Sequence, residues 1–350
     1  MNGSTAVHEH SAVLVLPHIR VQNANAISSP MTWGFPAITA FTGLMTALER
    51  RLGPQAGLAL TGIGVVCHGF EAQVTESGYT RSFHLTRNPV LQDGSTAGIV
   101  EEGRVHLDVT LVMEVQLTEV HCGEAERQAL AQRVAHELAG MRLAGGSVMP
   151  ACPGPTRQAR RPVLDLVPDD SQHEAQRAQF RRLARRLMPG FALVSRDDLL
   201  QARLAELLPD NPNATLLEAW LDLSRWNSHA ENRPAKAGND QAPTVEWVTD
   251  TRPGWTVPMP VGFAALSELQ VPGSVSGARD MRVPFRFVET VWSIGQWISP
   301  HRLKRLRDLV WRPDHDSDQP GGYGLYRCHN EYRAPAPRAD PAELADRTQH

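Results

Sequence analysis

The chain has 350 residues, of which 41% are hydrophobic, and it carries a formal net charge of −3. This length is enough to bury a sizeable core in one large domain or two. A net charge this close to zero excludes a protein whose whole surface attracts nucleic acid, so any nucleic-acid-binding face has to be a local patch.

The first predicted elements are a buried strand at 12–21, a polar loop, and a helix that starts near Pro36 and runs to about residue 52. Proline is well tolerated at the first position of a helix. Apolar residues recur every three or four positions from Ile38 to Leu52 and predict one buried stripe on that helix.

The polar loop concentrates side chains that hydrogen-bond, namely Asn23, Asn25, Ser28 and Ser29. Amides donate and accept at one place, which suits a base edge or a sugar–phosphate backbone. Trp33 offers a flat face on which a base can stack. The alternative is an ordered turn in which these side chains satisfy the backbone and Trp33 fills the core.

Three strands and a helix follow. Gly62 and Gly64 interrupt the strand predicted at 58–67 and indicate a close backbone neighbour. A short strand is predicted at 81–85. Strict alternation of apolar and polar residues predicts a strand at 104–117, and a stripe of apolar residues predicts a helix at 124–139 that ends at Gly140.

Two further loops carry candidate contacts. Arg87 and Asn88 precede a proline and are expected on a loop, where Arg87 contacts a ligand or forms an ion pair with Glu101 or Glu102. In the segment 141–147, Gly145-Gly146 allows a ligand to approach the backbone closely, although a tight turn explains the pair equally well.

Residues 150–172 are predicted to be a loop, and a strongly basic helix follows it. Five arginines fall within ten residues with no acid among them, and like charges four residues apart destabilise an isolated helix. A phosphate backbone would relieve this repulsion, whereas a solvated basic face is the alternative. The arginines are Arg177, Arg181, Arg182, Arg185 and Arg186.

The second half of the chain has weaker patterns. The predicted elements are a strand at 191–194, helices at 197–208 and 215–226, a mobile insert at 228–244, strand and turn at 245–273, helices at 287–298 and 302–311 separated by Ser299-Pro300, a strand at 323–326 and a disordered tail at 333–350.

No catalytic or metal-binding motif is present. Four dispersed cysteines and fourteen histidines show no zinc-ligand spacing, and there is no phosphate-binding loop or nucleophile elbow. We therefore predict no cofactor and no metal. Dispersed thiols and the lack of a secretion signal or a membrane-spanning run lead us to expect a cytoplasmic protein.

Several long strings, in one order, resemble a known family. Over roughly residues 12–330 the chain is similar to the second subunit of the type I-F CRISPR surveillance complex, the Csy complex, in the Cas-five-like branch of the RAMP proteins. The similar strings are 23–30, 32–36, 84–89, 93–97, 99–103, 141–147, 187–196, 279–280, 287–289 and 297–302.

The resemblance implies an α+β fold with a modified ferredoxin-like, RRM-related core and a mixed α/β C-terminal elaboration. We expect the core at 11–196, the elaboration at 197–332 and a tail at 333–350. The implied function is a non-catalytic subunit in antiviral defence that binds the 5′ handle of the crRNA. Implied partners are the large subunit and the repeated backbone subunit, with target DNA nearby.

The residue patterns and the resemblance together give one set of RNA-binding candidates. Two alternatives stay open: a metal-independent endoribonuclease that uses groups such as His68, Tyr79 and His84, and a structural module with no RNA affinity of its own. The candidates are Asn23, Asn25, Ser28, Ser29, Trp33, Arg87, Asn88, Arg104, Arg142, Gly145, Gly146, Arg181, Arg182, Arg185 and Arg186.

Overall fold

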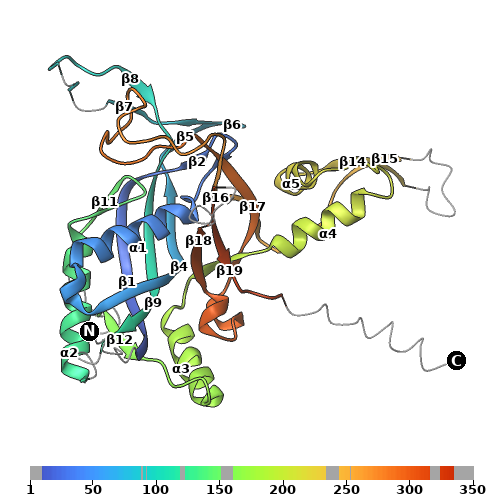
Figure 1. The fold of residues 1–350 in the computed structure, drawn as a ribbon. Coiled ribbons are helices and arrows are strands. Elements are labelled where there is room, and N and C mark those ends of the chain that lie inside the picture. The colour runs from blue at the N-terminus through green and yellow to red at the C-terminus, as the bar shows by residue number, and fades with distance from the viewer. Residues whose placement is uncertain are drawn as a thin grey trace, which may run out of the picture.

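An 11-stranded antiparallel sheet organises the part of the chain that the structure describes (Figure 1). The structure is a computed structural model. Its described residues are 10–87, 90–91, 93–118, 123–150, 161–233, 244–252, 254–315 and 324–334.

The first half of the sheet follows the chain order strand, helix, strand, strand, helix, strand. In space the four strands lie in the order β12-β1-β9-β4, and every neighbouring pair is antiparallel. The elements are β1 (His10–Asn25), α1 (Ile38–Leu52), β4 (Leu58–Ala72), β9 (Arg104–Leu117), α2 (Glu124–Ala139) and β12 (Val163–Leu166).

The alternation of side chains along β9 shows which face of the sheet is covered by α1 and α2. Val109 and Leu111 are buried in one core with Phe41 of α1 and Val134 of α2. The intervening Thr110 therefore faces the opposite side. The helix and strand predicted at 124–139 and 104–117 are confirmed with those bounds.

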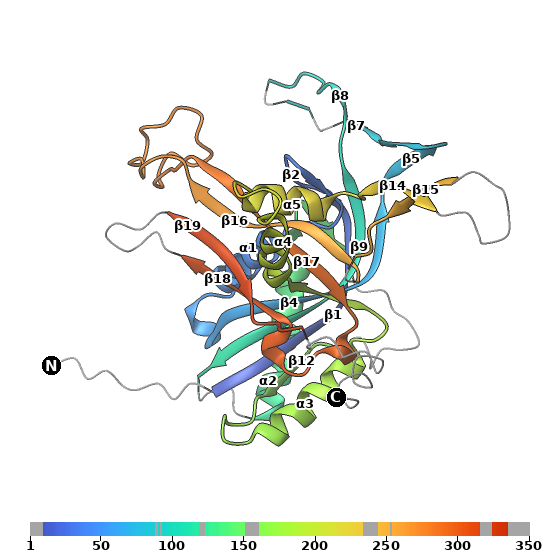
Figure 2. The ribbon, with the colours of Figure 1, turned by 90° about the vertical axis from the view of Figure 1, so that its right-hand side faces the viewer.

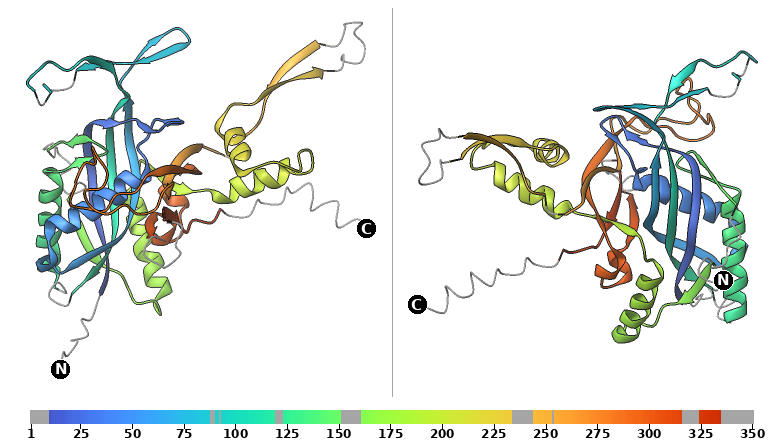
Figure 3. Two further views of the ribbon diagram at one scale, coloured as in Figure 1. Left: turned by 45° about the horizontal axis from the view of Figure 1, so that its top comes forward. Right: turned by 180° about the vertical axis from the view of Figure 1, so that it is seen from behind.

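Helix α3 (His173–Arg186) covers only part of the opposite face. Phe180 and Ala184 pack against Val13, Val15 and other strand residues in a second core. Seen from behind, α3 lies at one end of the sheet, and no described helix covers the other end of β1, β9 and β4 (Figure 3, right).

The edge of β12 away from β1 is occupied by side chains. Arg127 Nε donates to the Leu164 carbonyl (3.3 Å), and Gln179 Nε2 donates to the Leu166 carbonyl (2.7 Å). Gln128 Nε2 donates to the carbonyl of Pro162, just before the strand (3.1 Å). Such an edge has no open row of acceptors for another strand.

The second half of the sheet closes on β4. β13 pairs with β4, the chain of neighbours runs through β17, β16 and β19 to β18, and β18 pairs with β4 again (Figure 2). These strands are β13 (Phe191–Ser195), β16 (Thr256–Ala265), β17 (Val288–Ile298), β18 (Val310–His315) and β19 (Leu325–Asn330).

Polar groups fasten this ring to the central sheet. Both Glu114 carboxylate oxygens of β9 accept from Arg312 of β18, at 2.8 and 2.9 Å, and Thr61 donates to the same carboxylate. Burial opposes ionisation of Glu114, but the Arg312 hydrogen bonds hold its pKa below the usual value. In addition, the Trp311 indole N–H donates to the carbonyl of Leu193 (2.8 Å).

An arm projects from the ring. Helices α4 (Asp197–Leu207) and α5 (Leu216–Ser224) pack on β17 through Trp220, and α5 starts with a capping box between Thr215 and Glu218. β14 (Ser228–Arg233) and β15 (Thr244–Thr249) then form a separate two-stranded ribbon.

Smaller strands form hairpins at the end of the sheet away from α3. They are β2 (Ile27–Ser29), β3 (Thr32–Trp33), β5 (Val74–Ser77), β6 (Thr80–Phe83), β7 (Leu85–Arg87), β8 (Ile99–Glu101), β10 (Arg142–Leu143) and β11 (Gly146–Val148). Single 3-10 turns lie at Pro54–Ala56, Pro300–Arg302 and Leu306–Asp308.

Both helices predicted after residue 286 are wrong. Residues 288–298 form β17, which is rich in β-branched and aromatic residues and is hydrogen-bonded on both edges. Its residues 293–298 are buried on both faces, and such a segment lacks the period of two by which a strand is distinguished from a helix. Residues 302–311 form a 3-10 turn and the start of β18, with Pro300 in the turn before them.

Three other predictions need correction. β1 continues to Asn25, four residues past its predicted end, because β9 pairs with it along this length. β12 lies within the loop predicted at 150–172. The insert predicted at 228–244 is bounded by the paired strands β14 and β15, and its residues 234–243 lie outside the described part of the chain, as do residues 335–350 of the predicted tail.

Strands from both sides of the predicted boundary at 196 share one sheet and one core. Leu193 and Met259 belong to the same buried cluster as Phe41. The division into a core at 11–196 and an elaboration at 197–332 stays a prediction.

The glycines of β4 give a test of ring closure. A Cβ at Gly64 would lie 2.6 Å from Leu309 Cγ, so Gly64→Ala should destabilise the fold by about 1–3 kcal/mol through overpacking. Gly43 of α1 has open space around it, so Gly43→Ala should stabilise by about 0.5–1 kcal/mol. Urea unfolding of both variants measures this, and equal effects would contradict the close packing of β4 and β18.

Candidate nucleic-acid interface

The end of β1 joins two hairpins at one end of the sheet. The Asn25 backbone N–H donates to the Ala144 carbonyl in the β10–β11 turn (2.8 Å), and Asn25 lies opposite Arg104 of β9. Its side chain bonds the backbone of Ile27 through Nδ2 (2.8 Å) and Oδ1 (3.0 Å). These are the hydrogen bonds of the ordered-turn alternative, and they fix the start of the β2–β3 hairpin.

Asn23 lies two residues earlier at a break in the β1–β9 register. Its φ of 55° is in the left-handed region, which asparagine tolerates better than most residues. The Asn23 backbone N–H donates to His106 Nδ1 (3.2 Å), while the residue itself is exposed. The Asn23 amide therefore lies at the surface beside β9.

The two serines face into the hairpin. Thr32 Oγ1 lies 2.8 Å from Ser28 Oγ and 2.6 Å from Ser29 Oγ, and Ser29 is buried. Ser29 Oγ also accepts from the Trp292 indole N–H of β17 (2.9 Å). These hydroxyls brace the hairpin against the ring, and RNA contacts by Ser28 and Ser29 stay a prediction.

Trp33 is not the core residue that the alternative supposed. Its side chain is 51% exposed and meets the edge of Phe83, with ring centroids 5.8 Å apart. The neighbouring Phe35 takes the inner position, stacked on Phe41 (5.6 Å) and against the edge of Trp297. Trp33 thus presents an aromatic surface to solvent on a braced hairpin.

The two glycines of the β10–β11 hairpin have different roles. Ala144 (φ 48°) and Gly145 (φ 76°) form its two-residue turn, and a Cβ at Gly145 would meet open space. A Cβ at Gly146 would lie 2.6 Å from the backbone of Ala24. Gly146 is therefore required for packing on β1, and only Gly145 leaves its backbone open to a ligand.

Arginines flank these turns. Arg104 pairs with Glu102 (2.7 Å) and is partly buried. Arg142 is exposed on β10, where its backbone pairs with Ser147, and no hydrogen bond or ion pair of its side chain is found among the described residues. Arg142 is the freer of the two cations for a phosphate.

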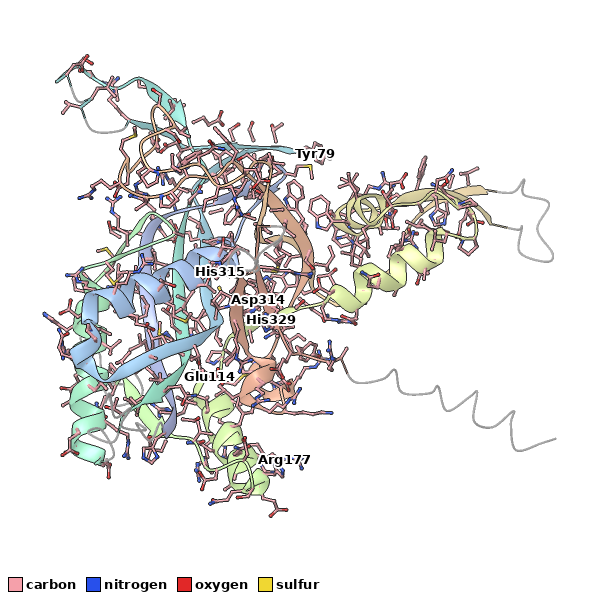
Figure 4. All side chains as sticks on the ribbon, in the orientation of Figure 1. Tyr79, Glu114, Arg177, Asp314, His315 and His329 are labelled. Atoms are coloured by element: carbon pink, nitrogen blue, oxygen red, sulfur yellow. The ribbon has the colours of Figure 1, made fainter. Side chains whose placement is uncertain are left out.

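The remaining candidates lie elsewhere. Arg87 is exposed at the end of β7 on the β7–β8 ribbon. The predicted ion pair of Arg87 with Glu101 or Glu102 is not found within the described chain. Asn88 lies outside the described residues. The α3 arginines Arg181, Arg182, Arg185 and Arg186 are exposed at the opposite end of the sheet. Figure 4 marks the two ends by Tyr79 of the β5–β6 turn and Arg177 of α3.

A polar cluster that we did not predict lies on the sheet face opposite α1. His18 and His68 stack with centroids 4.3 Å apart, and Asp108 accepts from His18 Nδ1 (3.0 Å). The Thr110 hydroxyl lies 2.7 Å from His68 Nε2, and His68 Nδ1 donates to the Pro189 carbonyl (2.6 Å). Alternation along β9 placed Asp108 and Thr110 on this face, but the two β-bulges that bring the histidines together have no sequence signal.

The RNA-binding candidates predicted from the sequence did not include three residues that contact this site, namely His106, Phe83 and Trp292. His106 was visible as a polar position of the alternating strand, whereas Phe83 and Trp292 come from distant segments.

Among the described residues, no group of three or more potential ligands is arranged for a metal ion. No described helix is long and apolar enough to cross a membrane.

An α+β fold with a large antiparallel sheet, and with hydrogen-bonded polar hairpins at one end of that sheet, defines the class of protein as a candidate nucleic-acid-binding protein. Residues 14–328 match the family model of the CRISPR-associated protein Csy2. The CRISPR-associated protein Csy2 of Pseudomonas aeruginosa (strain UCBPP-PA14) is 46% identical over 326 residues, which cover 92% of this chain and 96% of the relative. The chain therefore belongs to the Csy2 family, the second subunit of the type I-F CRISPR Csy complex.

The histidine cluster predicts a pH dependence of stability. Burial lowers the pKa of His68 below its ordinary value of 6.5, so the unfolded chain binds this proton more readily than the folded chain. The His68 contribution should be present above pH 6.5 and be lost as the pH falls below it. Urea unfolding between pH 7.5 and 5 should show this loss, and His68→Gln should reduce it. The exposed His301→Gln is the control, and an unchanged slope in His68→Gln would refute the assignment.

Proposed function

We propose that this protein binds the 5′ handle of the crRNA within the Csy complex, through the end of the sheet that carries 23–33, Arg104, Arg142 and Gly145. It holds the RNA without cutting it. The observation that carries the proposal is that Asn23 and Trp33 of the first polar loop and Arg142 of the segment 141–147 lie at the same end of the sheet, where the Asn25 N–H donates to the Ala144 carbonyl.

The topology supports this function. We infer that β12-β1-β9-β4, with α1 and α2 on one face, is a modified ferredoxin-like core, because its chain order and antiparallel pairing are those of the split βαβ motif. RRM-type sheets of this order bind single-stranded RNA by stacking splayed bases on aromatic side chains and bonding their edges. Trp33 and the exposed amide of Asn23 offer these two kinds of contact.

Rigidity of the hairpin favours recognition. A binding group that is already held in place loses little conformational freedom when the ligand arrives. The Ser29–Thr32–Trp292 hydrogen bonds fix β2–β3, and Phe83 supports the Trp33 ring. We therefore assign Ser28, Ser29 and Asn25 to shaping the site, with Trp33, Asn23 and Arg142 making the direct contacts.

The α3 arginines form a second basic region in this proposal. The sixteen residues of β1 span about 50 Å, so α3 lies a long way from the hairpins. We propose that Arg181, Arg182, Arg185 and Arg186 meet RNA phosphates beyond the handle or the terminal backbone subunit. Pairing with the large subunit and nearness to target DNA complete the proposed role.

The endoribonuclease alternative receives little support from the geometry. Both ring nitrogens of His68 are already hydrogen-bonded, and Tyr79 lies fully exposed in the β5–β6 turn. Incubating the purified protein with repeat RNA, with no metal added, should leave the RNA intact. A defined cut that is lost in His68→Gln would overturn the non-catalytic assignment.

Substitutions at the hairpins test the RNA contacts. Trp33→Ala should weaken binding of a labelled handle RNA by roughly 5- to 150-fold, because stacking of one base contributes about 1–3 kcal/mol. It should change the free energy of unfolding little, since the ring is half exposed. Phe35→Ala, by contrast, should mainly destabilise the fold. Equal RNA affinity of Trp33→Ala and the unmodified protein would count against stacking.

Salt dependence tests the phosphate contacts. Arg142→Gln should reduce the slope of log K against log salt by about 0.7 if it removes one phosphate contact to a single strand. Arg50→Gln, an exposed arginine at the end of α1, is the matched control and should leave the slope unchanged. An Arg181→Gln/Arg185→Gln pair, measured on handle RNA and on full-length crRNA, separates contacts with the handle from contacts beyond it.

A further inference from the structure

The turn before β18 extends the basic surface of α3. Residues 302–307, which we name the basic turn, carry four cations and no acid, namely Arg302, Lys304, Arg305 and Arg307. Leu303 of this turn packs in the second core with Leu187, next to the end of α3, so the turn and the helix lie side by side (Figures 1 and 3). All four cations are exposed, and so are the α3 arginines between 181 and 186. Two segments that are far apart in the chain therefore form one basic surface.

A groove runs between α3 and the basic turn. Arg182 and Arg186 line it from the helix, and Arg305 and Arg307 line it from the turn. Its volume is about 1730 Å³. Pockets for small molecules enclose roughly 300–1,000 Å³, so a groove of this size suits a segment of a polymer better than a metabolite.

Charge divides the groove into two ends. Asp165, Asp169 and Asp170 line the end beside β12 and the start of α3. At the other end, Arg182 and Arg186 form no ion pair with any residue that the structure describes. An anionic ligand is therefore repelled from the first end and attracted to the second.

The carboxylates at the basic end are neutralised within the fold. Glu114 (2.8 Å) and Glu331 (3.1 Å) both accept hydrogen bonds from Arg312. The buried Asp308 accepts from Arg305 (2.9 Å). These acids therefore do little to cancel the positive charge that the exposed arginines present to a ligand.

The exposed side chains of this surface suit phosphates rather than bases or another protein. Protein interfaces have an apolar centre, and single-strand sites stack bases on aromatic rings. Within 173–190 and 300–309, no phenylalanine, tyrosine or tryptophan is exposed, and Met188 is the one large hydrophobic residue that is. The next exposed ring, Phe191, packs against Trp255 instead. A duplex keeps its bases inside and presents its phosphates, which such a surface contacts without reading sequence.

We propose that α3 and the basic turn bind the phosphate backbone of a nucleic-acid duplex, independently of its sequence. Arg182 and Arg186 contact phosphates from the helix, and Lys304 and Arg307 contact them from the turn. Two duplexes offer this chemistry: crRNA paired with a target strand, and target DNA that is still double-stranded. The inference rests on the role proposed above for the α3 arginines and deepens it by choosing nucleic acid over the backbone subunit. It is independent of the handle contacts.

Titration of the full chain with a DNA duplex and with an RNA–DNA hybrid tests the proposal. Both probes have equal length and lack the handle sequence. Arg182→Gln/Arg186→Gln and Lys304→Gln/Arg307→Gln should each reduce the slope of log K against log salt for the DNA duplex by about 1.8, because each phosphate contact contributes about 0.9. The four side chains are exposed, so urea unfolding of both variants should match that of the unmodified chain.

A control variant of equal charge separates local contacts from net charge. Arg50→Gln/Arg133→Gln removes two exposed arginines, one from α1 and one from α2, and should leave the slope unchanged. Reduced slopes in the two groove variants and not in the control support the proposal. The probe that is bound more tightly then identifies which duplex supplies the phosphates.

Three outcomes would overturn the inference. They are equal slopes in the groove variants and the control, tighter binding of single-stranded RNA than of either duplex, and loss of another Csy subunit from the co-expressed complex while duplex binding persists. The last outcome assigns the surface to a protein partner. Both groove variants should bind handle RNA like the unmodified chain, whereas Trp33→Ala affects the handle site alone, so the two proposals fail separately.

Discussion

The structure depends on the close backbone approach between β4 and β18. A Cβ at Gly62 or Gly64 would crowd the side chain of Val310 or Leu309, so glycine at these two positions favours pairing of β18 with this edge of β4. Through this contact, β4 pairs with β9 of the central sheet and with β18 of the C-terminal ring at the same time. The ring in turn carries β17, whose Trp292 reaches the hairpin that begins at residue 27. Packing at the base of the ring and the geometry of the candidate interface are therefore linked.

The interface uses most of its polar side chains internally. Asn25, Ser29 and Thr32 satisfy one another or the backbone, and they leave a small set of outward groups on a firm support. This division explains why a stretch rich in amides and hydroxyls need not present all of them to a ligand. In the proposed function, specificity depends on where the backbone holds Trp33 and Arg142, because both side chains are exposed whereas Ser29 is buried.

Local patterns predicted the elements whose periodicity is unambiguous. The alternation of β9 and the stripe of α2 gave their bounds, and the glycines of β4 indicated the close neighbour that β18 supplies. β17 was mistaken for a helix because both faces of its second half, residues 293–298, are buried, which removes the period of two there. Part of the candidate interface was predicted, because residues such as Asn23, Trp33 and Arg142 lie in segments that resemble the known family. The bond from Trp292 to Ser29 joins positions 263 residues apart, and no local pattern encodes such a contact.

The three side chains on the outer edge of β12 have a consequence for how copies of the protein can meet. Arg127, Gln128 and Gln179 occupy the carbonyls that a neighbouring strand would need. Sheets with open borders polymerise by adding strand to strand, and that route leads to fibres of undefined length. Here the border is sealed by long side chains from two helices, so growth of a larger particle on this side has to proceed through side-chain surfaces, which can limit the number of subunits that join.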